Sequence, residues 1–124
     1  LRSLTLANHS RMTGPLPTAL GRLRQLTRLT LFRSGFTGGI PIELTNATNL
    51  QTLELFENPL GGVLPSTLGR LTKLETLDLF KCRMTGEIPA SISQLSSLQT
   101  LTLNYNQFSG ELPAGLATLP KLKG

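Results

Sequence analysis

The chain has 124 residues, of which 39% are hydrophobic and 15% charged, and its formal net charge is +5. This composition excludes a disordered tail, and no apolar run is long enough to insert into a membrane. One cysteine and one histidine exclude an internal disulfide framework and a multi-cysteine zinc site. Leucine dominates the aliphatic residues, with 28 Leu against four Ile and one Val, so one packing arrangement is used repeatedly.

A Leu-x-x-Leu-x-Leu run opens the chain at Leu1 and returns at a nearly constant spacing throughout. The later runs open at Leu26, Leu50, Leu74 and Leu98, and Leu122 begins another. We therefore predict a single array over 1–124, with repeats at 1–25, 26–49, 50–73, 74–97 and 98–121 and the start of a sixth at 122. Because neither end carries a capping segment, we expect a fragment of a longer solenoid that lacks both caps.

Within each repeat, the last two leucines alternate with other residues at period 2, which is typical of a strand with one buried face. Stacked repeats then form a parallel sheet. Three places after the third leucine, an inward polar side chain is expected to hydrogen-bond neighbouring backbone in a buried ladder. The ladder residues are Ser34, Asn58, Cys82 and Asn106, with Ser10 or His9 in the first repeat. A proline then starts a short 3₁₀ or helical return segment in each repeat.

The complete pattern reads Leu-x-x-Leu-x-Leu-x-x-Asn-x-Leu-x-Gly-x-Ile/Leu-Pro-x-x-Leu-x-x-Leu, and its Gly-to-Pro element recurs at 14–17, 38–41, 62–65, 86–89 and 110–113. It resembles the plant-type, extracellular leucine-rich repeat of receptor-like kinase and receptor-like protein ectodomains and of polygalacturonase-inhibiting proteins. The resemblance implies an α/β-type repeat solenoid. Five repeats would form a horseshoe arc with a concave parallel β-sheet and a convex side of 3₁₀ or short helical segments. It also implies a protein or peptide ligand, a co-receptor or a secreted hydrolase as the partner.

Phenylalanine follows the third leucine in three adjacent repeats, at outward positions that we call the aromatic row: Phe32, Phe56 and Phe80. The next position forms the charged row, Arg33, Glu57, Lys81 and Tyr105, while Glu54 and Asp78 face outward within the strands. An apolar patch with a charged rim is typical of protein interfaces, so we predict that these nine residues bind a partner. The alternative is that the rings only pack across strands and stabilise the sheet.

The net charge of +5 raises nucleic acid as a partner, but the positions of the cations argue against it. The sheet face carries both signs, so no continuous basic track forms, and several cations are expected on the return segments: Arg22, Arg24, Arg70 and Lys73. Two triplets match the N-glycosylation sequon, Asn46-Ala47-Thr48 and Asn8-His9-Ser10. We expect Asn46 to be exposed on a return segment, and Asn8 to lie near the concave face, where a glycan would obstruct binding.

Nothing in the sequence predicts catalysis. Cys82 is expected to be a buried core thiol, His9 and Ser10 have no acidic partner, and no phosphate-binding loop is present. We therefore expect a chain that is not an enzyme and has no cofactor or metal. The predicted function is protein or peptide recognition within a secreted or cell-surface receptor-like glycoprotein. The alternative is a structural or assembly subunit of an intracellular or organellar complex, docked permanently through its edges or convex side.

Overall fold

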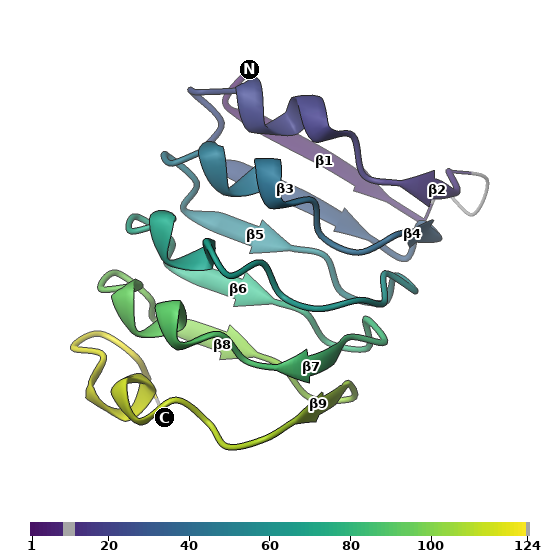
Figure 1. The fold of residues 1–124 in the computed structure, drawn as a ribbon. Helices are drawn as coiled ribbons and strands as arrows, with labels where there is room; N and C mark the ends of the chain where they lie inside the picture. The colour runs from purple at the N-terminus through teal and green to yellow at the C-terminus, as the bar shows by residue number, and fades with distance from the viewer. Residues whose placement is uncertain (9–11, 124) are drawn as a thin grey trace.

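The computed structural model describes residues 1–8 and 12–123 and shows a stack of repeats with a sheet on one side and 3₁₀ turns on the other (Figure 1). The sheet contains five parallel strands in the order β1-β3-β5-β6-β8. Their bounds are β1 Ser3–Ala7, β3 Arg28–Phe32, β5 Thr52–Glu54, β6 Thr76–Asp78 and β8 Thr100–Thr102. The predicted fold class, a leucine-rich-repeat solenoid with a parallel sheet, is confirmed.

The strand register follows the repeat spacing. Ser3 pairs with Arg28, and Arg28 pairs in turn with Thr52, so each residue meets its equivalent in the neighbouring repeat. Leu29, Leu53 and Leu77 meet one another across neighbouring strands and are at most 1% exposed. Because side chains alternate along a strand, this register brings every buried leucine to the same face.

The return segments are short 3₁₀ helices on the side opposite the sheet (Figure 1). They are η1 Thr18–Arg22, η2 Ile42–Asn46, η3 Leu68–Arg70, η4 Ala90–Gln94 and η5 Ala114–Thr118. A proline immediately precedes four of them, whereas Thr67 precedes η3. Their backbones approach closely, since a Cβ on Gly69 would lie 2.5 Å from the carbonyl oxygen of Ser91. Glycine is therefore required at that contact.

Two additional parallel sheets of two strands each connect the main sheet to the return segments. They pair β2 (Gly14–Pro15) with β4 (Phe36–Thr37), and β7 (Thr85–Glu87) with β9 (Gln107–Ser109). The repeat pattern does not predict these short strands.

One continuous apolar core runs through the stack from Leu16 to Leu119. Its central layers are sealed, because Leu55 and Leu79 are not exposed at all. The corresponding Leu6 and Leu103 in the first and last strands are only half-buried. A repeat therefore completes its burial only when it has a neighbour on both sides.

Candidate functional site

The aromatic row lies at the carboxyl ends of the strands; two of its rings pack on each other, and the third packs on Tyr105 of the charged row. Phe32 and Phe56 stack with ring centroids 4.6 Å apart and planes inclined by 11°. Phe80 instead contacts Tyr105 edge to face, with centroids 5.1 Å apart and planes at 70°. All three phenylalanines are half-buried, whereas Tyr105 is 71% exposed. The rings thus pack on one another and still present apolar surface to solvent.

The charged row has an unusual backbone conformation. Arg33, Glu57, Lys81 and Tyr105 have φ between 51° and 59°, in the left-handed region that non-glycine residues rarely adopt. Asn8, at the same position of the first repeat, has φ 57°. Backbone pairing across the repeats holds this row in place: the amide of Glu57, for example, donates to the carbonyl of Phe80 at 2.8 Å. Strained backbone of this kind concentrates at functional sites.

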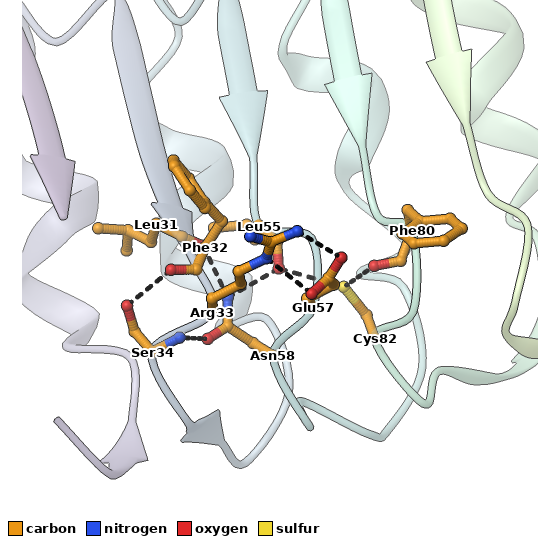
Figure 2. Close-up of polar contacts among 9 residues, drawn as sticks. All are labelled: Leu31, Phe32, Arg33, Ser34, Leu55, Glu57, Asn58, Phe80 and Cys82. Atoms are coloured by element: carbon orange, nitrogen blue, oxygen red, sulfur yellow. Dashed lines mark hydrogen bonds and ion pairs between the residues drawn. The ribbon is translucent and has the colours of Figure 1, made fainter. Parts of the chain in front are cut away.

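One ion pair organises the charged row. Arg33 Nε donates to Glu57 Oε2 at 2.8 Å, and Arg33 Nη2 lies 3.4 Å from Oε1 (Figure 2). The hydrogen bond to Glu57 raises the pKa of Arg33, and the bond from Arg33 lowers the pKa of Glu57. Lys81 is not part of this pair, and its Nζ lies 5.8 Å from the centroid of the Phe80 ring. The positive charge of Lys81 therefore remains available beside the aromatic row.

The two outward carboxylates within the strands differ in environment. Glu54 Oε2 accepts a hydrogen bond from the hydroxyl of Thr30 at 3.0 Å, and Asp78 Oδ1 accepts from the backbone amide of Phe80 at 3.0 Å. Burial raises the pKa of Asp78, the hydrogen bond from Phe80 opposes this, and the charge of Glu54 raises it further. Both carboxylates retain oxygen lone pairs that a donor on a partner could use.

A groove of about 300 Å³ opens beside the charged row and is lined by Glu57, Asn58, Pro59, Lys81, Arg83 and Tyr105. Sequence analysis missed Pro59 and Arg83 as lining residues. Arg83 is exposed and also has positive φ, at 55°. The groove contains two cations and one carboxylate already paired with Arg33.

The buried ladder fixes the strand ends that carry these side chains. Asn58 is 1% exposed and makes four hydrogen bonds. It donates to the carbonyls of Leu31 and Leu55 and accepts from the amide of Ser34 (Figure 2). It also accepts from the amide of Phe36 at 3.3 Å. Asn106 repeats the arrangement further along the stack, accepting from the amides of Cys82 and Met84 and donating to the carbonyls of Leu79 and Leu103.

Ser34 and Cys82 occupy the same position with smaller side chains. Ser34 Oγ donates to the carbonyl of Phe32 at 2.9 Å, and Cys82 Sγ donates to the carbonyl of Leu55 at 3.2 Å. Cys82 is not exposed, and burial raises its pKa to about 11. The position of Ser10 or His9 in the first repeat lies outside the described residues.

The two sequon asparagines have different surroundings. Asn46 closes η2 and is half-buried rather than exposed as expected, because its Oδ1 accepts a hydrogen bond from Arg70 Nη1 at 3.2 Å. Asn8 is exposed directly after β1, at the carboxyl end of the sheet, and the other two residues of its sequon lie outside the described chain.

The described part of the chain meets neither the requirements of a membrane-spanning helix nor those of a metal site with three or more ligands. None of the helices within 1–8 and 12–123 is long and apolar enough to cross a bilayer. The same residues contain no group of three or more His, Cys, Asp or Glu side chains placed to hold a metal ion.

Comparison with known proteins identifies the architecture. A family model described as leucine rich repeat matches residues 48–108. The plant peptide hormone receptor RGFR1, solved in complex with RGF2, superposes with a TM-score of 0.96 at 30% identity, covering 98% of this chain and 20% of that one. Among curated proteins, no sequence matches the chain.

Two Arabidopsis thaliana receptor kinases are also similar. The LRR ectodomain of GASSHO1/SCHENGEN3, solved with CASPARIAN STRIP INTEGRITY FACTOR 2, gives a TM-score of 0.94 at 40% identity, over 99% of this chain and 15% of that one. HAESA, solved with the peptide hormone IDA and the co-receptor SERK1, superposes with a TM-score of 0.88 at 39% identity, covering 99% of this chain and 21% of that one. The chain thus spans about a fifth or less of these structures. Its repeat pattern, sheet and 3₁₀ segments match these structures across nearly its whole length, so the chain belongs to the leucine-rich-repeat family, with repeats of the plant type.

Proposed function

We propose that this chain is a non-catalytic recognition module that binds a protein or peptide on its concave sheet face. The aromatic row carries the proposal, because three half-buried phenylalanines on an otherwise polar face form an apolar anchor with charge around it. The similar receptors named above were solved with peptide or protein ligands, which supports a ligand of the same class. Their being receptor ectodomains supports an extracellular or cell-surface location.

The dimensions of the face favour a short extended segment. Five parallel strands about 4.8 Å apart make it roughly 19 Å across, which an extended peptide at about 3.3 Å per residue crosses in about six residues. A standard protein interface of about 800 Å² per partner would require further repeats. The chain therefore supplies one part of a contact surface rather than a complete one.

The charges specify the ligand further. Glu54 and Asp78 lie beside the aromatic row and keep free lone pairs, so they favour a basic or amine-bearing group. Arg33 and Lys81 lie on the two sides of the row, but the guanidinium of Arg33 is already paired with Glu57. A ligand carboxylate would therefore lie on the side of Lys81.

A displayed library of random short peptides tests the proposal. We expect selection on the purified protein to enrich peptides that combine apolar and basic residues. Phe56→Ala should weaken a selected peptide by about 2 kcal/mol in titration calorimetry, because Phe56 stacks within the central repeats. Phe32→Ala and Phe80→Ala should cost less.

The matched control is the convex double variant Arg22→Ala/Arg70→Ala, which removes two exposed cations from the return segments. It should change affinity little. If the convex pair abolishes association while Phe56→Ala leaves it intact, the module docks through its convex side, as the assembly-subunit alternative requires. Failure to enrich any peptide would count against a peptide-binding face.

A further inference from the structure

A second groove lies at the opposite end of the strands from the aromatic row. It is open, has a volume of about 500 Å³ and is here called the strand-entry groove; its lining residues are Arg2, Gln25, Thr27, Asn49, Gln51 and Lys73. Arg2, Thr27 and Gln51 immediately precede β1, β3 and β5. These three residues form one row of equivalent positions. A second row, two places earlier in each repeat, consists of Gln25, Asn49 and Lys73, and the groove lies between the two rows. In Figure 1 this is the end of the sheet at which the strand arrows start.

The backbone of the strand-entry groove is already paired. The amides of Thr27 and Arg28 donate to the carbonyl of Arg2 at 2.8 and 3.1 Å, and the amide of Gln51 donates to the carbonyl of Thr27 at 2.7 Å. These bonds hold the lining residues in a regular stack about 4.8 Å apart. Because the backbone groups satisfy one another, the side chains of Gln25 and Gln51 are left to meet solvent or a ligand, and both are exposed.

Asn49 positions a lysine at this groove. Asn49 Nδ2 donates to the carbonyl of Arg24 at 2.6 Å, and Asn49 Oδ1 accepts from Lys73 Nζ at 2.7 Å. The asparagine is therefore fixed from both ends, and the ammonium group is held by a neutral oxygen. Two of the three ammonium hydrogens stay available for a further acceptor.

The electrostatic balance of the groove is positive. Its lining contains two cations and no carboxylate, and Arg24 and Arg28 flank it in sequence. The neighbouring carboxylate is that of Glu75, which occupies the position of Gln51 in the next repeat and whose amide donates to the carbonyl of Gln51. Within residues 1–8 and 12–123 the one ion pair is Arg33–Glu57, at the far end of the strands. Among those residues, the cations of the strand-entry groove therefore have no ion-paired carboxylate.

We propose that the strand-entry groove binds a small, hydroxylated oxyanion, to which Arg2 and Lys73 both make charge-assisted contacts. The guanidinium and the ammonium suit carboxylate, sulfate or phosphate oxygens. The neighbouring side-chain amides of Gln25 and Gln51 provide donors and acceptors for hydroxyl groups. The Thr27 hydroxyl donates to the carbonyl of Arg2 at 3.0 Å, so it provides lone pairs as an acceptor. Every lining side chain is polar or charged, so the groove suits a ligand that is polar throughout. From Arg2 to Gln51 the groove extends about 10 Å, which exceeds a bare ion.

Three probes distinguish the source of the anionic group: inorganic phosphate, glucose 6-phosphate and glucuronate, each titrated into the purified protein at constant ionic strength. Glucose serves as the uncharged reference. We expect saturable binding of a hydroxylated anion, tighter than that of inorganic phosphate, with amide NMR shifts centred on Thr27 and Gln51. The better of the two sugar probes identifies phosphate or carboxylate as the preferred group.

The double variant Arg2→Gln/Lys73→Gln should weaken binding by about tenfold or more, since it removes both charge-assisted contacts. Its matched control, Arg22→Gln/Arg70→Gln, removes the same charge from the convex side and should change affinity less than about twofold. Asn49→Asp keeps the side-chain shape but gives Lys73 a counterion, so it should also weaken binding. Equal weakening by the control, amide shifts centred on Lys81 and Arg83, or no saturable binding of any probe would overturn the proposal. Shifts at Lys81 and Arg83 would place the anion beside the aromatic row instead, whereas the other two outcomes leave the proposal for the aromatic row unchanged.

Discussion

Within β5, Leu53 and Glu54 are adjacent in sequence and face opposite environments. Leu53 is 1% exposed and packs in the core, whereas Glu54 is half-buried on the concave face and accepts a hydrogen bond from Thr30. Across the central strands the inward position is always leucine, while the outward position is Thr30, Glu54 and Asp78 in turn. The inward face repeats because each layer must fit the next, and the outward face is free to vary.

This contrast separates what specifies the fold from what specifies a partner. In a solenoid each repeat contacts only its neighbours, so an identical inward pattern solves every interface at once. The outward side chains contribute little to that packing, and their variation can therefore carry recognition. Substitutions at four positions test the separation, beginning with the largest expected effect.

Leu77→Ala should lower the free energy of unfolding by about 2–5 kcal/mol, because it leaves a cavity in a layer with no exposed surface. Urea denaturation followed by circular dichroism measures the change. Thr100 is an exposed outward residue in the adjacent strand, so Thr100→Ala should change the free energy of unfolding by less than about 0.5 kcal/mol. Comparable losses from the two changes would remove the distinction between the faces.

Asn58→Ala should cost about 1–3 kcal/mol, because two buried carbonyls and two buried amides lose their side-chain partner. Asn104→Ala is the matched control, since Asn104 also follows a strand but is exposed. Denaturation of both variants provides the measurement. If Asn58→Ala were as stable as Asn104→Ala, the hydrogen bonds of the ladder would contribute nothing to the free energy of unfolding.

The repetitive part of the molecule could be predicted from the sequence. The constant repeat spacing predicts the strand order and register, since equal spacing aligns equivalent residues in parallel strands. The alternation of Leu53 and Leu55 with Glu54 indicates which face is buried. The array boundaries at 1–124 and the absence of caps stay predictions.

The outward details could not be predicted, because they depend on distances between side chains in neighbouring repeats. Three equivalent phenylalanines gave no sign that Phe80 would contact Tyr105 rather than Phe56. The left-handed backbone of Arg33, Glu57 and Lys81 has no composition signal, since none of these residue types favours positive φ. Asn8, which tolerates that conformation, was the one available indication.

At Lys81 the order of two substitutions tests this backbone conformation. Lys81 has φ 55°, so Lys81→Gly should be more stable than Lys81→Ala by about 1 kcal/mol, because glycine adopts positive φ without steric cost. At Glu75, an exposed residue that lies outside the positive-φ set, alanine should instead be the more stable of the two. Thermal unfolding of the four variants gives both orders. If Lys81→Ala were more stable than Lys81→Gly, the positive φ at this position would be contradicted.

Cys82→Ser should have the smallest effect at pH 7, less than about 1 kcal/mol, because a serine hydroxyl can donate to the carbonyl of Leu55 as the thiol does. The pH dependence identifies the thiol. Burial raises the pKa of Cys82 to about 11, above the value of about 8.5 for an unfolded cysteine. Between these values the unfolded chain has released the thiol proton while the folded chain retains it, so raising the pH favours unfolding. Relative to Cys82→Ser, the original protein should therefore lose stability as pH rises from about 9 to 11, as urea denaturation across that range would show. A stability difference that stays constant over this interval would mean that the thiol is not desolvated in the ladder.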